Sequence, residues 1–266
     1  MKLCLILNPW LKTKLSKFWS PLRRASFFFI NSDMKFSDWT VIRVTWLFVI
    51  TILGLPYVIT TLPIWQIVIG FVLAVLVARV GNIGYHRWLT HDQFTPSYLG
   101  RKLMLSCMVL SGLTPPGHYI HAHLNHHRYS DKPGDPHNPK EIGFIRFFFG
   151  LYESPRPIFM RNYAKNKDAV WLTKHYWNLY IASLILLGII SPWLIVWLAF
   201  MFSWSWILTM HLNWNGHKEG KPTNLGWISN IFLGGEDYHK NHHENPSKLI
   251  MGPRDVSGKY IIPLLQ

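Results

Sequence analysis

The 266-residue sequence is poor in cysteine, with only Cys4 and Cys107. Two cysteines cannot build a disulfide framework, and no Cys-x-x-Cys pair is present for zinc binding or redox chemistry. Acidic residues are also scarce, since 13 Asp and Glu stand against 27 Lys and Arg, giving a formal net charge of +14. Nucleic acid, anionic lipid and acidic substrates could all match such an excess, so the positions of the charges must decide.

Charge is absent altogether from two long stretches. No Asp, Glu, Lys or Arg lies between Arg43 and Arg79, and none lies between Lys174 and Lys218. Because one membrane span needs about 20 apolar residues, each stretch has room for two helices and a tight turn. A soluble protein with buried helices is the alternative, and two uncharged stretches of this length disfavour it. We expect turns at 61–63 and 191–192 and helices at about 40–60, 64–84, 177–190 and 193–211.

The two predicted turns carry no charge, which fixes the expected orientation. Every Lys and Arg falls in the N-terminal, central or C-terminal segment, and two hairpins place all three on one side of the membrane. The positive-inside rule makes that side cytosolic, so anionic lipid is an expected partner and nucleic acid is not. We predict an all-α integral membrane protein with four transmembrane helices in two hairpins and a cytosolic helical cap. Both termini and the active site are expected in the cytosol.

The predicted segments follow from this arrangement. They are a basic amphipathic N-terminal segment at 1–39, a first transmembrane hairpin at 40–84, a cytosolic region at 85–176, a second hairpin at 177–211 and a cytosolic C-terminal region at 212–266. Within the first segment, residues 10–24 have an apolar stripe at roughly 100° per residue with the basic residues off it, which predicts an interfacial helix. A disordered basic tail is the alternative, and Pro21 supports it. No cleaved targeting segment is expected, because no small-residue cleavage pattern follows the short apolar start.

Nine of the 14 histidines follow a spacing pattern. They are His86 and His91 in HRWLTH, His123, His126 and His127 in HLNHH, His239, His242 and His243 in HKNHH, and His217 in NWNGH. Positions i, i+3 and i+4 share one helix face, so each H-x-x-H-H motif presents three imidazoles to one point. The first pair is five apart, about 140° out of phase on an α-helix, and requires the helix to end or bend.

Clustered imidazoles repel one another when protonated and bind metal when neutral. A single histidine is more often a surface or hydrogen-bonded core residue. Two copies of H-x-x-H-H together with a third pair disfavour that structural role. Nine ligands exceed the needs of one ion and suit two. Imidazole suits iron, which reacts with oxygen, although composition alone leaves two zinc ions open.

These motifs resemble the histidine boxes of the membrane fatty acyl desaturases, particularly the Δ9, stearoyl-CoA type. GYHRWLTH, HLNHHRYSDKPGDPHNP and GGEDYHKNHHENP stand in that family's order, and the resemblance runs from about residue 40 to about residue 246. It implies two Fe²⁺ ions that use O2 to place a cis double bond, at Δ9, in a saturated acyl chain. One iron is implied on His86, His91, His123, His127 and His242, and the other on His126, His217, His239 and His243.

The resemblance extends to residues around the metals. Asn213 matches an asparagine that approaches the second iron through water, and His137 matches a position outside direct coordination. Asp135, Glu236 and Asp237 are candidates to orient imidazole N–H groups, with solvated loop acids as the alternative. Gly70 and Ala74 match positions that cap the acyl tunnel, where small side chains predict a deep tunnel and helix packing is the alternative.

The chain also departs from the family pattern. His121 and Ala122 replace an Arg-Asp pair of acyl-CoA members, and Met210 replaces a tryptophan. A guanidinium suits coenzyme A phosphates and a neutral imidazole does not, so the acyl carrier stays open between CoA, a membrane lipid and acyl carrier protein. No HPGG motif of a fused b-type cytochrome is present, and a separate ferredoxin or b-type cytochrome is the expected electron donor.

Two other functions compete with desaturation. A membrane di-iron hydroxylase acting on an alkane, a sterol-like lipid or a carotenoid would share the histidines and differ in its product. A non-catalytic metal-binding or transport protein would place ionisable groups at mid-membrane, and the two long stretches carry no charge.

Overall fold

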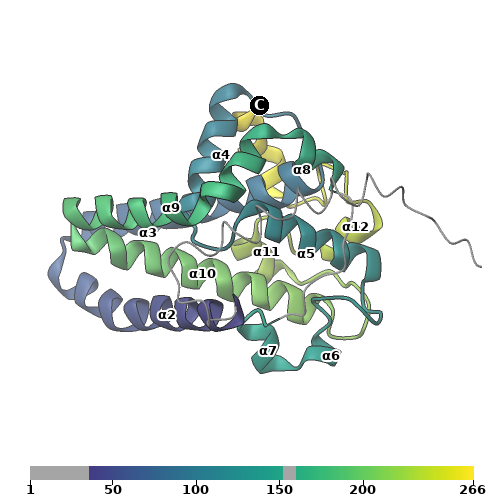
Figure 1. Ribbon diagram of the computed structural model, residues 1–266, viewed down its shortest axis with the longest axis horizontal. Coiled ribbons are helices and arrows are strands. Elements are labelled where there is room, and N and C mark those ends of the chain that lie inside the picture. Colours follow the sequence, from purple (N-terminus) through teal and green to yellow (C-terminus); the bar gives the residue numbers. More distant parts are fainter. Residues whose placement is uncertain (1–35, 152–159) are drawn as a thin grey trace, which may run out of the picture.

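The computed structural model describes residues 36–151 and 160–266, so the interfacial helix predicted at 10–24 lies outside the described residues. Within those ranges every regular element is a helix, which confirms the all-α prediction for them. Four long helices run side by side and the shorter ones gather beyond one end of them (Figure 1). The elements are α2 Phe36–Thr61, α3 Ile64–Asn82, η1 Ile83–Thr90, α4 Tyr98–Leu110, α5 Pro116–Tyr129, α6 Pro139–Ile142, α7 Phe144–Phe148, α8 Arg161–Lys165, α9 Lys167–Ile190, α10 Pro192–Gly216, α11 Trp227–Leu233, α12 His239–Glu244, η2 Ser257–Ile261 and α13 Ile262–Leu265.

The long helices break where the turns were predicted. Pro63 precedes α3, and Pro192 occupies the first turn of α10, where its missing N–H would have no helical partner in any case. Two ends differ from expectation. The helix α9 begins ten residues before the predicted start, because the Asn166 side chain accepts a hydrogen bond from the amide of Ala169 and caps it. The helix α10 continues past His211 to Gly216, since no residue there interrupts it.

Three helical stretches in the described part of the chain are long and apolar enough to cross a membrane: 40–61, 64–90 and 192–216. Their outer surfaces expose large apolar side chains, among them Leu53 at 70% and Ile64 at 73%. Contiguous exposed apolar surface of this extent is suited to lipid rather than water. The helix α9 lies alongside them (Figure 1), with exposed Ile189 and Ile190 at one end and charged Lys167 and Asp168 at the other.

The helix α10 lies at the centre of the bundle and contacts α2, α3 and α9. Gly70 is in this contact region, where an added Cβ would overlap the indole of Trp197. Ala74 is buried in the same cluster as Trp197. Both small residues therefore sit where helices pack closely, which is the alternative interpretation of their size, and a tunnel-capping role stays a prediction.

The short helices meet at the ends of α3 and α10. The helix α5 packs on η1 and on α9, and α12 packs on α10. The C-terminal α13 returns to α4, and the carbonyl of Leu265 accepts a hydrogen bond from the amide of Ser97 at 2.9 Å. The four segments that carry the nine patterned histidines are thus assembled at one end of the long helices.

Candidate metal centre

A change in helical winding brings His86 and His91 together. Residues Ile83–Thr90 form a π-helix, in which an amide bonds to the carbonyl five residues earlier, and the amide of His91 donates to the carbonyl of His86 at 3.2 Å. The wider turn places positions five apart near one face, so the two ring centroids lie 4.9 Å apart. The helix does end at Thr90, as the spacing required, but the winding before that end aligns the pair.

The nine histidines gather into two groups. Within each group the potential ligand nitrogens all lie within 4.8 Å of one another. The five-histidine group contains His86, His91, His123, His127 and His242, and the four-histidine group contains His126, His217, His239 and His243. The same division is implied by the family resemblance.

The nitrogen spacing in the five-histidine group matches a coordination shell. His123 Nε2 lies 3.0 Å from both His91 Nε2 and His127 Nε2, and His242 Nε2 lies 3.0 Å from both His86 Nε2 and His127 Nε2. Two nitrogens each about 2.1 Å from one ion, at right angles around it, would lie about 3 Å apart. These residues therefore fit a bound transition metal in both number and spacing.

Carboxylates contact the Nδ1 atoms of three imidazoles. His126 Nδ1 donates to Asp135 at 2.8 Å and His217 Nδ1 donates to Asp131 at 2.8 Å, while His86 Nδ1 lies 2.6 Å from Glu236 Oε2. A proton held at Nδ1 leaves a lone pair on Nε2 of the neutral ring.

The Nε2 atoms of His126 and His217 face each other at 3.1 Å, and His239 Nε2 lies 2.7 Å from His217 Nε2. Because the Nδ1 protons of the first two rings point to carboxylates, their facing lone pairs repel each other unless a cation lies between them. This pairing is the feature of the four-histidine group that fits a metal.

Asp131 was not identified from the sequence. It adopts a positive φ of 57°, which aspartate tolerates better than most residues, and its amide donates to Asp135 Oδ2 at 2.9 Å. Asp135 and Glu236 contact imidazoles as predicted, but the carboxylate of Asp237 accepts from Asn230 Nδ2 at 2.6 Å. The turn-forming SDKPGD sequence was the only available signal for Asp131.

Burial keeps seven of the nine histidines neutral. Desolvation lowers the pKa of His127 to about 3, and neighbouring imidazoles add to the effect. The same causes, in the same order, hold the pKa of the following histidines well below the ordinary value: His91, His123, His126, His239, His242 and His243. Neutral imidazole is the form that binds a metal.

Other predicted residues lie nearby. Asn213 is buried on α10 one turn before His217, and the ring of His137 lies 5.1 Å from that of His126. Burial lowers the pKa of His137 to about 4. Gly216 leaves room for the imidazole of His239, because an added Cβ would come within 2.8 Å of His239 Cδ2.

Arg87 links the five-histidine group to the C-terminal segment. Its Nε donates to Glu236 at 2.7 Å, and its Nη1 and Nη2 donate to Asp255 at 2.9 and 3.0 Å. Both Arg87 and Asp255 are fully buried. Burial raises the pKa of Glu236, but the charge of Arg87, together with the contacts from Arg87 and His86, outweighs it, so that pKa lies well below the usual range.

Comparison with known proteins identifies similar sequences. The family model described as fatty acid desaturase matches residues 62–248. The sn-1 stearoyl-lipid 9-desaturase of Anabaena variabilis is 31% identical over 179 residues, 61% of this chain and 65% of that protein. A protein of the same name from Synechocystis sp. is 26% identical over 226 residues, 77% of this chain and 69% of that protein.

An acyl-CoA C20 Delta5-desaturase of Anemone leveillei is also similar, with 28% identity over 183 residues, 61% of this chain and 57% of that protein. The matched part thus covers under two thirds of the length of the Anabaena and Anemone relatives. The names of these relatives include both lipid-linked and CoA-linked substrates.

Proposed function

Because this chain belongs to the fatty acid desaturase family, we propose that it is a membrane oxidoreductase that introduces a cis double bond, at Δ9, into a saturated acyl chain. Two groups of clustered histidines with facing Nε2 atoms carry the proposal, since this arrangement suits two redox metal ions at adjacent positions. We assign one iron to the five-histidine group and one to the four-histidine group, with Asn213 reaching the second through water.

The reaction balances with O2 and two electrons from outside. A –CH2–CH2– unit, O2, two electrons and two protons give –CH=CH– and two molecules of water, and the irons when bound supply this oxidation. The protein's own residues hold and orient the metals. Asp135 and Asp131 accept Nδ1 protons and Glu236 contacts His86 Nδ1, which directs the Nε2 lone pairs inward. Burial of the imidazoles limits access of water to the site.

The proposed topology has four spans. Besides the three apolar stretches, α9 would cross the membrane with its apolar end, so that 40–84 and 177–211 form two hairpins. Residues 1–39, 85–176 and 212–266 would lie in the cytosol with both termini and the metal centre. The electrons would come from a separate ferredoxin or b-type cytochrome.

Fatty-acid profiling in a host that lacks unsaturated fatty acids, with a suitable electron donor, tests the activity. We expect a product two hydrogens lighter than its saturated precursor. A product heavier by one oxygen would instead indicate a hydroxylase, and no product from iron-loaded protein would contradict both enzymatic functions.

Matched histidine variants test the metal assignment in the same host. His126→Ala should abolish the product and lower bound iron while membrane insertion persists. His175→Ala is the control, because that ring packs against Trp171 with centroids 4.8 Å apart and belongs to neither group. Full activity of His126→Ala would contradict its role as a ligand.

A further inference from the structure

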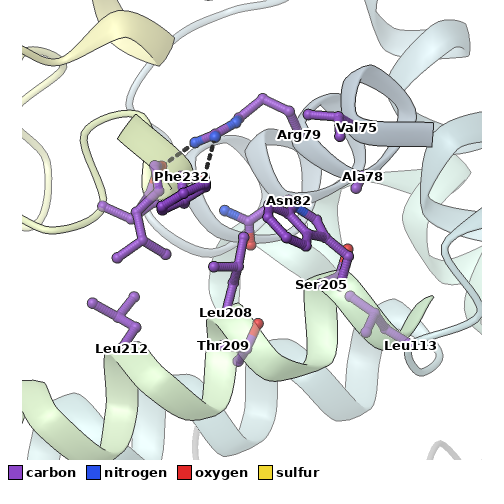
Figure 2. A pocket seen from close by; sticks show the side chains of 13 residues that line it. Val75, Ala78, Arg79, Asn82, Leu113, Ser205, Leu208, Thr209, Leu212 and Phe232 are labelled. Atoms are coloured by element: carbon purple, nitrogen blue, oxygen red, sulfur yellow. Dashed lines mark hydrogen bonds between the residues drawn. The ribbon is translucent and has the colours of Figure 1, made fainter. Parts of the chain in front are cut away.

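A cavity of about 60 Å³ lies between α3, α10 and α11 (Figure 2). Its lining includes Glu236, which contacts His86 of the metal centre. Its walls are largely apolar. Val75 and Ala78 of α3 face Leu208 and Leu212 of α10 across it, and Phe232 of α11 closes one side. A cavity with this lining favours a hydrocarbon chain over a polar ligand.

The helix α11 forms the rim at the level of the membrane-spanning stretches. The ring of Phe232 packs on that of Trp204 of α10, with centroids 5.5 Å apart. Arg79 of α3 donates to the carbonyls of Phe232 and Leu233 (Figure 2). The next residue, Gly234, has a φ of +60°, and an added Cβ there would overlap the guanidinium. The helices α3 and α10 thus hold α11 in place.

The outer face of α11 is apolar and exposed. Its four large apolar residues Trp227, Ile228, Ile231 and Phe232 are between 42% and 64% exposed. On α3, Phe71, Val72 and Leu76 are exposed as well, within a stretch apolar enough to span a membrane. The rim of the cavity therefore continues the apolar surface of α3, which favours lipid over water outside it.

The inner end of the cavity reaches a residue that supports the metal centre. Glu236 lines the cavity, and the carboxylate of this residue lies 2.6 Å from His86 Nδ1. Asn82, also in the lining, lies one helical turn before His86, about 5–6 Å along the chain axis. The cavity thus lies between the lipid-facing surface and a residue that orients a metal ligand.

We propose that this cavity is a lateral portal, through which the acyl chain of a membrane lipid passes from the bilayer to the metal centre. The portal rests on the proposed function and names its carrier: a lipid that stays in the membrane, rather than a water-soluble thioester. We choose a membrane lipid as the carrier because the rim of the cavity continues the apolar surface of α3. A soluble carrier would instead need an opening that faces water.

Spin-label accessibility tests the portal without requiring activity. In protein with Cys4→Ser and Cys107→Ala, a nitroxide is attached at Ala78→Cys and the iron-loaded protein is reconstituted in phosphatidylcholine vesicles. Leu76→Cys on the exposed face of α3 and Lys248→Cys on the C-terminal segment give the lipid and water references. We expect the Ala78 label to collide with O2 and to be shielded from a water-soluble nickel chelate. Nickel collisions as frequent as at Lys248 would overturn the portal.

Activity with two carriers provides the second test. Val75→Trp fills the cavity, and its neighbour Leu76→Trp places the same indole on the exposed face. With stearoyl phospholipid in the vesicles, Val75→Trp should lose at least about tenfold in turnover relative to Leu76→Trp, at equal iron content.

Equal turnover of the two variants, or turnover of stearoyl-CoA alone by the unsubstituted protein, would overturn the portal. If the unsubstituted protein desaturates neither carrier, the proposed function fails, and the accessibility result still decides whether the cavity opens to lipid.

Discussion

At the scale of single residues, Asp131 orients one proposed metal ligand, because its carboxylate accepts the Nδ1 proton of His217 at 2.8 Å. Asp131→Asn keeps the side-chain size and tolerates the positive φ, but it loses the charge that stabilises this tautomer. We expect iron affinity to fall about 10- to 100-fold, measured by metal content after titration. Asp92→Asn is the matched control, since Asp92 is exposed and has a similar φ of 52°. An equal effect of both substitutions would contradict the role of Asp131.

The buried histidines also predict how metal-free protein responds to acid. Their unfolded pKa is about 6.5, and burial followed by neighbouring imidazoles lowers it in the folded state, to about 3 for His127. The unfolded chain then binds more protons between these values, so stability falls as the pH falls through this window. The Tm of metal-free protein in detergent should be lower at about pH 5 than at about pH 7.5. An equal or higher Tm in acid would show that these imidazoles are not held neutral.

The histidines could be identified from sequence because ligand spacing is local, with i, i+3 and i+4 on one helix. Asp131 could not, since its contact with His217 joins residues 86 positions apart. Asp237 was a candidate to orient an imidazole N–H, but successive residues of a turn point in different directions, and its carboxylate accepts from Asn230.

At the scale of elements, the C-terminal segment is fastened to η1 through a buried ion pair. Asp255 accepts two bonds from Arg87 and further bonds from the amides of Met251 and Gly258. Asp255→Asn should destabilise the fold by about 3 kcal/mol, because a buried charge loses its partner.

Limited proteolysis with mass spectrometry measures this effect as faster cleavage within 246–266. Asp168→Asn is the control, since its pair with Arg101 is 3.2 Å long but partly exposed and contributes little. Similar cleavage of both variants would mean that the Arg87 pair does not hold the segment.

The turns between the long helices could be predicted, because proline and the uncharged stretches mark those turns directly. They did not give the start of α9, where a polar turn capped by Asn166 precedes the apolar part. The π-helical winding of η1 was also beyond the spacing argument, since its wide turn is stabilised by tertiary packing of fully buried residues such as Tyr85 and Arg87.

At the scale of the whole molecule, the proposed four-span topology makes a prediction about sidedness. In protein with Cys4→Ser and Cys107→Ala, Thr61→Cys and Ser191→Cys should react with an impermeant maleimide from the side opposite the cytosol. Lys248→Cys should react only from the cytosolic side. If Ser191→Cys labels from the cytosol while Thr61→Cys labels from outside, α9 does not cross the membrane.

The pairing of distant histidines has a consequence for the order of synthesis. His86 lies 3.0 Å from His242 through their Nε2 atoms, although 156 residues separate them along the chain. A ribosome adding about 5–20 residues per second needs roughly 8–30 s to join them. During that interval the first helices would already be in the bilayer with an incomplete ligand set. Loading of the proposed metals would therefore be a late event in the life of the nascent protein, after the last histidine segment has emerged.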